Sequence, residues 1–203
     1  MIRLSDFDTI IFDFGGVILD ICPDLSRMEF AKMFGKHNAV KLETSGLMQE
    51  YEKGQMDKAG FAENVRKITG ANYSDEEIVK AWCAMLLDYK EPRIEWIKRL
   101  RNTHKLLMLS NTNDSHFEYF HSKLQREFGV TFYQLFDHVY LSHEMHLLKP
   151  SHEIFQAVID EQKLDPSRTL FIEDTEKNAV SAQEVGLKTL VIPRNGNFYE
   201  FFE

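Results

Sequence analysis

Four positions that could do acid, alcohol or amine chemistry follow apolar stretches of this chain. In order, they hold Asp13, Ser110 with Asn111, Lys149, and Glu173 with Asp174. A carboxylate at the end of a buried segment is costly unless a cation pairs with it. Gly15 and Gly16 come shortly after the first acid and allow backbone N–H groups to approach a ligand closely. The combination predicts acids that face an anion through a metal ion.

Each of these positions also has an ordinary structural explanation. Asp13 fits a turn after a strand, and Ser110 fits a turn or a helix cap. Lys149 could be a solvated surface lysine, and Glu173 and Asp174 could begin a helix, whose positive end favours acids. Their joint occurrence at the ends of several strands favours a single crevice. Acids gathered there would repel each other without a cation, so a divalent metal ion is expected. Mg²⁺ held by one or two carboxylates and a substrate phosphate fits these residue types.

Buried strands that alternate with helices are expected to position these residues. Apolar runs without alternation are typical of strands covered on both faces. The predicted strands are 10–12, 106–109, 139–141, 169–172 and 189–192. The predicted helices are 94–100, 116–128, one to about Glu161 with Pro150 in its first turn, and one that stops at Gly186. This order predicts an α/β fold with a parallel sheet, whose ligands bind outside the carboxyl ends of the strands.

The segment from Cys22 to about Tyr89 contains helical spacings and no strand-like run. Four helices are predicted there, from Ser26 to Gly35, Leu47 to Gly54, Phe61 to Gly70, and Ser74 through Leu86, the last opened by a capping box. We therefore expect a core domain formed by residues 1–20 and 90–203. Residues 21–89 are expected to form a small all-helical domain inserted after the first strand.

Composition limits the location and the partners of the protein. The net charge of −8 and the lack of a Lys/Arg run argue against a nucleic-acid or anionic-membrane surface. Cys22 and Cys83 make neither a metal spacing nor a disulfide framework, and no signal or transmembrane run is evident. We expect a cytoplasmic protein, monomeric or homodimeric. Its aromatic tail, 198–202, is expected to pack on the core, with a dimer contact as the alternative.

The sequence resembles the haloacid dehalogenase superfamily. The matching motifs, in order, are Asp13-Phe-Gly-Gly-Val, Ser110-Asn111-Thr112, Lys149-Pro150-x-x-x-Ile-Phe and Phe-Ile-Glu173-Asp174-Thr-x-x-Asn178-Ala. The resemblance covers the whole chain, with 21–89 in the place of the helical cap of the first subfamily. It implies a Rossmann-like three-layer α/β/α core. Within the superfamily, the chain looks closest to small sugar phosphatases of the α-D-glucose-1-phosphate phosphatase type.

The resemblance implies a Mg²⁺-dependent phosphomonoesterase acting on a small phosphorylated metabolite. Asp13 would attack phosphorus and form an aspartyl-phosphate, which water then hydrolyses. Ser110 would donate to a phosphoryl oxygen, and Lys149 would neutralise charge on the nucleophile and the phosphoryl group.

The same resemblance implies how the ions are held. Asp13 and Asp174 would bind Mg²⁺ with the backbone carbonyl of Gly15, and Glu173 would act directly or through water. Asn178 would orient the metal-binding loop without contacting the ion itself. The remaining implied substrate contacts are Gly15, Gly16 and Asn111.

The chain departs from the family pattern at the position that usually holds the general acid. Gly15 stands where most superfamily phosphatases have a second aspartate, and general acid–base help is worth roughly 10²–10⁴-fold. We therefore hypothesise a substrate that leaves through a relatively acidic oxygen, such as a sugar 1-phosphate. Asp20, Glu52 and Asp57 are candidate replacement acids, although each also fits solvated surface. His146 is a second departure, because relatives often have glycine before the lysine.

Two other functions and one other metal are considered. A C–halogen hydrolase would use the same Asp13, but those enzymes usually carry an aromatic residue at the place of Gly15, and the retained pair Glu173–Asp174 argues for a metal. A non-catalytic sugar-phosphate-binding protein is the second alternative. His143 and His146 do not have the i, i+4 helical spacing of the zinc metalloprotease pair.

Overall fold

A five-stranded parallel sheet forms the centre of the molecule. The computed structural model describes residues 2–203. The strands are β1 (Thr9–Phe12), β4 (Lys105–Ser110), β5 (His138–Leu141), β6 (Thr169–Glu173) and β7 (Lys188–Val191), in the spatial order β5-β4-β1-β6-β7. Ile10 of β1 lies opposite Leu106 on one side and Leu170 on the other. The strand that carries Asp13 at its end is therefore the central one.

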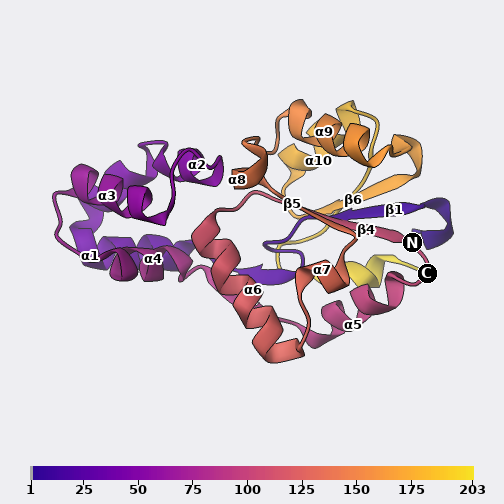
Figure 1. Cartoon of the computed structure of the whole chain (residues 1–203), viewed down its shortest axis with the longest axis horizontal. Coiled ribbons are helices and arrows are strands. Elements are labelled where there is room, and N and C mark those ends of the chain that lie inside the picture. The colour runs from indigo at the N-terminus through magenta and orange to yellow at the C-terminus, as the bar shows by residue number, and fades with distance from the viewer. Residues whose placement is uncertain (1) are drawn as a thin grey trace.

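Helices cover both faces of this sheet (Figure 1). One face carries α5 (Glu91–Leu100), α6 (Asp114–Phe128) and α7 (Phe132–Leu135), and the other carries α9 (His152–Gln162) and α10 (Glu176–Glu184). Because successive strand side chains point to opposite faces, Ile10 and Phe12 join the apolar cluster on the first face, and Ile11 joins the cluster on the second. The predicted three-layer α/β/α core is confirmed.

The inserted helices have an apolar cluster of their own. They are α1 (Pro23–Glu43), α2 (Leu47–Glu52), α3 (Lys58–Thr69) and α4 (Asp75–Cys83), and they lie to the left in Figure 1. Phe30, Tyr51, Phe61 and Trp82 form the centre of this cluster. The predicted capping box at Ser74 is present. Gly35 has φ of 78° and interrupts α1 where the sequence predicted a stop. We call α1–α4 the cap, and the domain limits 1–20, 21–89 and 90–203 remain a proposal.

Two short strands, absent from the sequence prediction, connect the cap to the core. β2 (Leu19–Ile21) and β3 (Leu86–Tyr89) pair in antiparallel fashion. The prediction of a helix through Leu86, with no strand before Tyr89, was wrong. Each strand has only three or four residues and mixes apolar with acidic positions. Their pairing partner lies far away in the sequence, so the local pattern carries no signal for either.

The other boundaries differ from the prediction by small amounts. The sequence predicted that Pro150 lies in the first turn of a helix. Instead, α9 begins at His152 after Ser151, so Pro150 lies before the helix. A four-residue helix, α8 (Ser142–Met145), follows β5 and was also missed. Short 3₁₀ turns complete the chain: η1 (Leu4–Asp6), η2 (Pro166–Arg168) and η3 (Phe198–Phe201).

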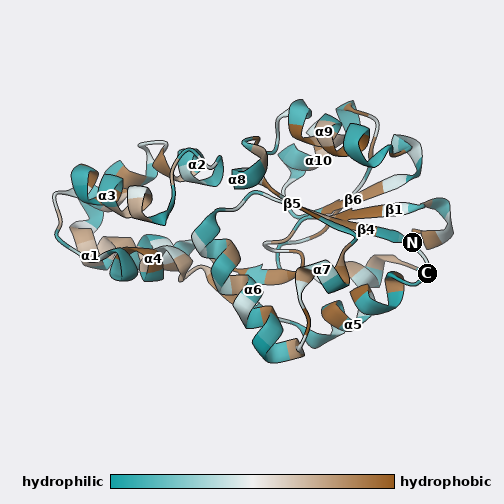
Figure 2. Cartoon of the chain, in the orientation of Figure 1, coloured by the Kyte–Doolittle hydropathy of each residue, from teal (hydrophilic) through white to brown (hydrophobic). Residues whose placement is uncertain are grey.

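The aromatic tail packs onto the core in this structure. Phe198 is fully buried, and its ring centroid lies 5.3 Å from those of Phe12 and of Trp96. Apolar residues follow the strands, whereas polar residues dominate the outer helix faces (Figure 2). Within residues 2–203, no helix combines the length and the apolar character needed to cross a membrane.

Candidate active site

The nucleophile candidate and the lysine candidate meet at the carboxyl edge of the sheet. Lys149 Nζ lies 2.6 Å from Asp13 Oδ1 and 2.9 Å from Glu173 Oε2. All three side chains are buried, since β1 and β6 deliver the acids at adjacent strand ends and the loop after β5 brings the lysine across them. One buried ammonium therefore serves two buried carboxylates.

Asp174 completes a cluster of three acids. Carboxylate oxygens of Asp13, Glu173 and Asp174 all lie within 4.8 Å of one another. A Cβ on Gly16 would stand 2.5 Å from Asp174 Oδ2, so only glycine lets the two loops approach this closely; its φ of 89° also suits glycine. Oxygen ligands and excess negative charge are what Mg²⁺ requires, so the residues present fit this ion.

Charge and burial act against each other in this cluster. Burial and the neighbouring Glu173 raise the pKa of Asp13 to about 8, although Lys149 opposes them. Burial also raises the pKa of Asp174, against the effect of its ion pair with Arg194, whose Nε lies 2.6 Å from Asp174 Oδ2. A bound divalent cation would favour the ionised form of both acids.

Glu173 is held by a complete set of hydrogen-bond donors. Its Oε1 accepts from the backbone N–H groups of Asp174 (3.0 Å) and Thr175 (3.1 Å), and its Oε2 accepts from Lys149 and from Asn178 Nδ2 (3.0 Å). Burial alone would raise the pKa of Glu173, but the charge and hydrogen bond of Lys149 outweigh it and lower the pKa. A carboxylate offers about four acceptor positions, so Glu173 has none left for direct contact with a metal in this arrangement.

The residues after β4 divide between the cavity and the lysine loop. Ser110 is buried and lines the same cavity as Asp13 and Gly15. Asn111, predicted to bind substrate, also lines this cavity, and its side chain donates to the carbonyl of Lys149 (2.9 Å) and accepts from the N–H of Lys149 (2.9 Å). Its side chain therefore holds the lysine loop in place.

This cavity has a volume of about 250 Å³, and the cap contributes Glu52 to its lining. Besides the predicted residues, Lys177, Arg194, Met85 and Glu52 line it. Sequence reasoning did not select the first three, because none of them stands directly at the end of a predicted strand or at a specified position of a matching motif. Glu52 was named only as one of three candidate acids.

The other two candidate acids have structural roles outside the cavity. Asp20 lies 2.7 Å from Arg93 Nη1 and 3.1 Å from Lys90 Nζ, and the Arg93 side chain is fully buried. Asp57 caps α3 by accepting from the N–H of Gly60 at 2.9 Å. The alternative expectation of solvated surface was therefore wrong for Asp20, which belongs to a largely buried ion pair.

His146 occupies the loop position where the family often has glycine. Its φ of 56° lies in the left-handed region, which glycine adopts at lower cost. Its Nδ1 lies 3.0 Å from the carbonyl oxygen of Lys53 in the cap. The loop before Lys149 thus keeps a backbone shape that favours glycine while the histidine side chain contacts the cap.

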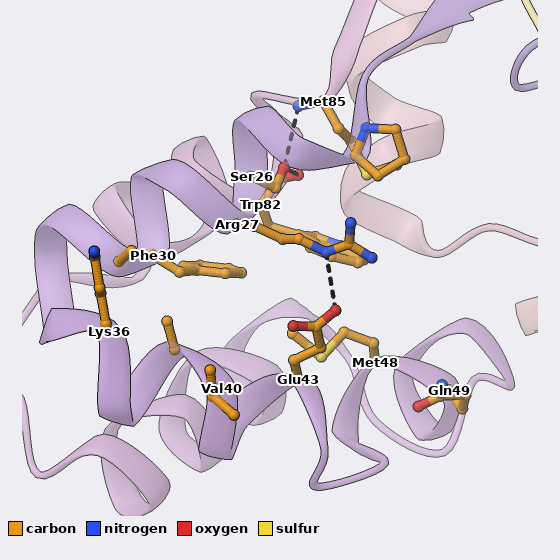
Figure 3. A pocket seen from close by; sticks show the side chains of 13 residues that line it. Ser26, Arg27, Phe30, Lys36, Val40, Glu43, Met48, Gln49, Trp82 and Met85 are labelled. Carbon is orange, nitrogen blue, oxygen red and sulfur yellow. Dashed lines mark hydrogen bonds and ion pairs between the residues drawn. The ribbon is translucent and has the colours of Figure 1, made fainter.

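A second cavity, of about 420 Å³, lies inside the cap and away from the acids (Figure 3). Phe30, Val40 and Trp82 give it an apolar lining, and an ion pair of 2.9 Å between Arg27 and Glu43 crosses it. Among the described residues, no cluster of acids that could hold a metal faces this space, and the hydroxyl of Ser26, which lines it, is already bonded to the carbonyl of Trp82 at 2.6 Å. The smaller polar cavity at the strand ends is therefore the site to which chemistry is assigned.

The cavity at the strand ends brings a carboxylate paired with a lysine next to a second carboxylate loop, beside a helical cap. The chain belongs to the haloacid dehalogenase-like hydrolase family, whose model matches residues 7–186. This result confirms the family predicted from the four motifs.

Characterised relatives agree with this assignment. The chain is 30% identical over 190 residues to the D-ribitol-5-phosphate phosphatase of Bacteroides thetaiotaomicron, covering 92% of each protein. The expectation of a phosphatase agrees with the activity of this relative. A haloacid dehalogenase-family enzyme of the same organism, solved with magnesium and inorganic phosphate, superposes with a TM-score of 0.91 at 29% identity, over 97% of this chain and 100% of that one. A structure from Porphyromonas gingivalis, described as a predicted haloacid dehalogenase-like hydrolase, superposes with a TM-score of 0.87 at 27% identity, over 95% of this chain and 94% of that one.

Proposed function

We propose that this protein is a Mg²⁺-dependent phosphomonoesterase whose substrate is a phosphorylated sugar or sugar alcohol. The single observation that carries the proposal is the contact of Asp13 with Lys149, 2.6 Å, inside a cavity that also holds Asp174. The relative named for D-ribitol 5-phosphate and the neighbour solved with magnesium and phosphate support the substrate class and the ion. A cytoplasmic location is part of the proposal, supported by the two free cysteines.

In the proposed reaction, a carboxylate oxygen of Asp13 attacks phosphorus and the bond to the leaving alcohol oxygen breaks. The resulting aspartyl-phosphate is then hydrolysed by water, which restores the carboxylate. Lys149 keeps Asp13 oriented and offsets the charge that develops on the phosphoryl group. Ser110, buried at the end of β4, donates to a phosphoryl oxygen.

The metal would be held by Asp13, Asp174 and the backbone carbonyl of Gly15. When bound, it supplies charge stabilisation for the phosphoryl group. Glu173 acts through its four hydrogen bonds, which fix the backbone at Asp174 and Thr175 and the Lys149 ammonium. Arg194 would exchange its contact with Asp174 for one with the substrate.

The test is hydrolysis of para-nitrophenyl phosphate and of a panel of sugar phosphates, with Mg²⁺ and with EDTA. We expect activity that needs Mg²⁺, and a loss of roughly 10⁴-fold or more in Asp13→Asn, because the nucleophile is removed. Activity on 2-haloacids that survives EDTA would instead identify a dehalogenase. Binding of sugar phosphates without turnover of any ester would identify a non-catalytic protein.

A further inference from the structure

The proposed reaction lacks a proton donor in the core. Gly15 has no side chain to supply a proton, and the core carboxylates of the cavity, Asp13, Glu173 and Asp174, belong to the nucleophile and the metal loop. His116 also lines the cavity, but burial lowers its pKa to about 4, so it carries no proton to give near neutral pH beyond the one that its Nε2 shares with a backbone carbonyl. A primary alcohol, such as the leaving group of a ribitol 5-phosphate, departs poorly as an anion. A donor worth roughly 10²–10⁴-fold is therefore still to be found.

Glu52 is the one ionisable cap residue that lines this cavity. The other cap and connecting residues in the lining, Ile21, Met85 and Leu86, are apolar. Within residues 2–203, the carboxyl group of Glu52 has no hydrogen-bond or ion-pair partner, although its side chain is partly buried. Glu52 is thus a partly buried carboxylic acid that lines the cavity of Asp13 and, in the part of the chain that the structure describes, stabilises no neighbouring group through an ion pair or a hydrogen bond of its side chain.

The position of Glu52 is fixed by contacts between the cap and the core on both sides of it. Ser142 Oγ donates to the backbone carbonyl of Glu52 at 2.6 Å. The preceding residue, Tyr51, bonds through its hydroxyl to Asp114 and Ser115 of α6.

The residues that follow are held as tightly. The carbonyl of Lys53 contacts His146 Nδ1 at 3.0 Å. A Cβ on Gly54 would stand 2.0 Å from the carbonyl oxygen of His143, so the backbone of the cap is in direct contact with the backbone of α8 there. The end of α2 is therefore held against the loops that follow β4 and β5.

We infer that Glu52 is the general acid and base of this site, a role that the chain has moved from the nucleophile loop to the cap. The inference rests on the proposed phosphatase function. In the first step, the O–H of Glu52 gives its proton to the leaving alcohol oxygen as Asp13 forms its bond to phosphorus. In the second step, the Glu52 carboxylate takes a proton from the attacking water, and phosphate leaves Asp13. Both residues return to their starting states.

The protonation of Glu52 suits these steps. Burial raises the pKa of Glu52 to about 7, against the opposing charges of Lys149 and Lys177. A carboxylic acid with a pKa near the working pH can both give and accept a proton. With this donor in place, the reason to expect an acidic leaving oxygen no longer holds, and a primary phosphate ester becomes an equally good substrate.

The test compares Glu52→Gln, Glu52→Asp and the wild-type protein on a series of ring-substituted phenyl phosphates. These esters carry no sugar hydroxyl, so a lost substrate contact cannot imitate a lost proton donor. For Glu52→Gln we expect kcat/KM to fall roughly 10²-fold or more on phenyl phosphate and less than about 10-fold on para-nitrophenyl phosphate, whose leaving group needs no proton. The steeper dependence on leaving-group acidity is the signature, and Glu52→Asp should recover part of it.

Glu50→Gln is the matched control, since Glu50 is an exposed acid on the same helix, and it should leave the whole series unchanged. An equal fall of Glu52→Gln on all esters, or none on any, would overturn the inference. Thermal unfolding with and without Mg²⁺ checks that each variant is folded. Wild-type protein that hydrolyses no phosphate ester would contradict the proposed function itself, which is a separate outcome.

Discussion

In the core, the groups around the cavity come from the ends of neighbouring strands, whereas in the cap Glu52 comes from the last residue of a six-residue helix. Asp13, Lys149 and Glu173 are buried and bonded to one another, so the core part of the site is organised before any ligand binds. The carboxyl group from the cap is unpaired within residues 2–203, and contacts made by its backbone and by its neighbours in the chain fix its place. The core thus provides a rigid charged centre, and the cap provides a group whose position depends on docking.

The largest effect is expected where the charged centre loses its cation. Lys149→Met leaves the buried carboxylates of Asp13 and Glu173 without the cation that pairs with both, which costs roughly 3–5 kcal/mol of unfolding free energy. It should also lower kcat by roughly 10³-fold, because the lysine offsets charge in the transition state. Denaturant unfolding and steady-state kinetics measure both losses. Lys177→Met is the control, since Lys177 lines the cavity but is exposed; equal losses in both variants would contradict the special role of Lys149.

A smaller effect, dependent on pH, is expected at the junction of the cap with the core. His116 of α6 stacks on Trp82 of α4 at 4.7 Å, and its Nε2 lies 3.2 Å from the carbonyl oxygen of Trp82. Burial lowers the pKa of His116 from 6.5 to about 4, against the attraction of Asp114. The unfolded chain therefore binds the proton first, and stability falls as the pH drops from about 6.5 towards 4.

The size of this pH effect follows from the pKa difference. His116 should contribute a loss of roughly 2–3 kcal/mol of unfolding free energy between about pH 7 and pH 4.5. The measurement is denaturant unfolding at both pH values in wild type and in His116→Phe, which keeps the stacked ring but does not titrate. His138→Phe, at an exposed histidine, is the control. An unchanged pH dependence in His116→Phe would contradict the assignment.

The smallest effect is expected where the cap meets the loop after β5. Ser142→Ala removes the donor to the Glu52 carbonyl together with the acceptor of the Thr112 N–H, and should cost about 1–2 kcal/mol of stability. Because the charged centre is untouched, the rise in Tm on adding Mg²⁺ should stay the same, while kcat/KM for a primary sugar phosphate falls several-fold. Thr169→Val, which removes a buried hydroxyl at the far end of β6, is the control for stability without a change in activity. A lost Mg²⁺ response in Ser142→Ala would show that the two regions are not separable in this way.

The same contrast explains what could be predicted from the sequence. Asp13 and Glu173 were found because parallel strands produce uninterrupted apolar runs, and the polar residue that ends such a run lies at the ligand-binding edge. Lys149 was found from its place before Pro150, in the loop after a predicted strand, and from the motif that it matches. Helix limits in the cap followed from Ser74 and from glycines such as Gly70. Each of these features can be recognised from a few neighbouring residues in the sequence, and the parallel sheet then brings the residues at the strand ends together.

The missed features all depend on contacts between distant segments. β2 and β3 pair across more than sixty residues, so neither looks like a strand by itself. Arg194 reaches Asp174 from the loop after β7, and Glu52 reaches the cavity only when α2 lies against α8. No spacing in the sequence indicates these approaches, which is why Glu52 could be named but not selected.

The pairing of β2 with β3 also has a consequence for how the family diversifies. The chain leaves the sheet domain at Leu19 and returns at Tyr89, and these two residues are direct partners. The whole insertion therefore has adjacent ends, like a loop on a hairpin, and could be replaced by another insertion, or by a short turn, without cutting any strand of the central sheet. Grafting the segment between Ile21 and Leu86 into a relative would transfer the acid of the cap as a module while leaving the recipient's nucleophile in place.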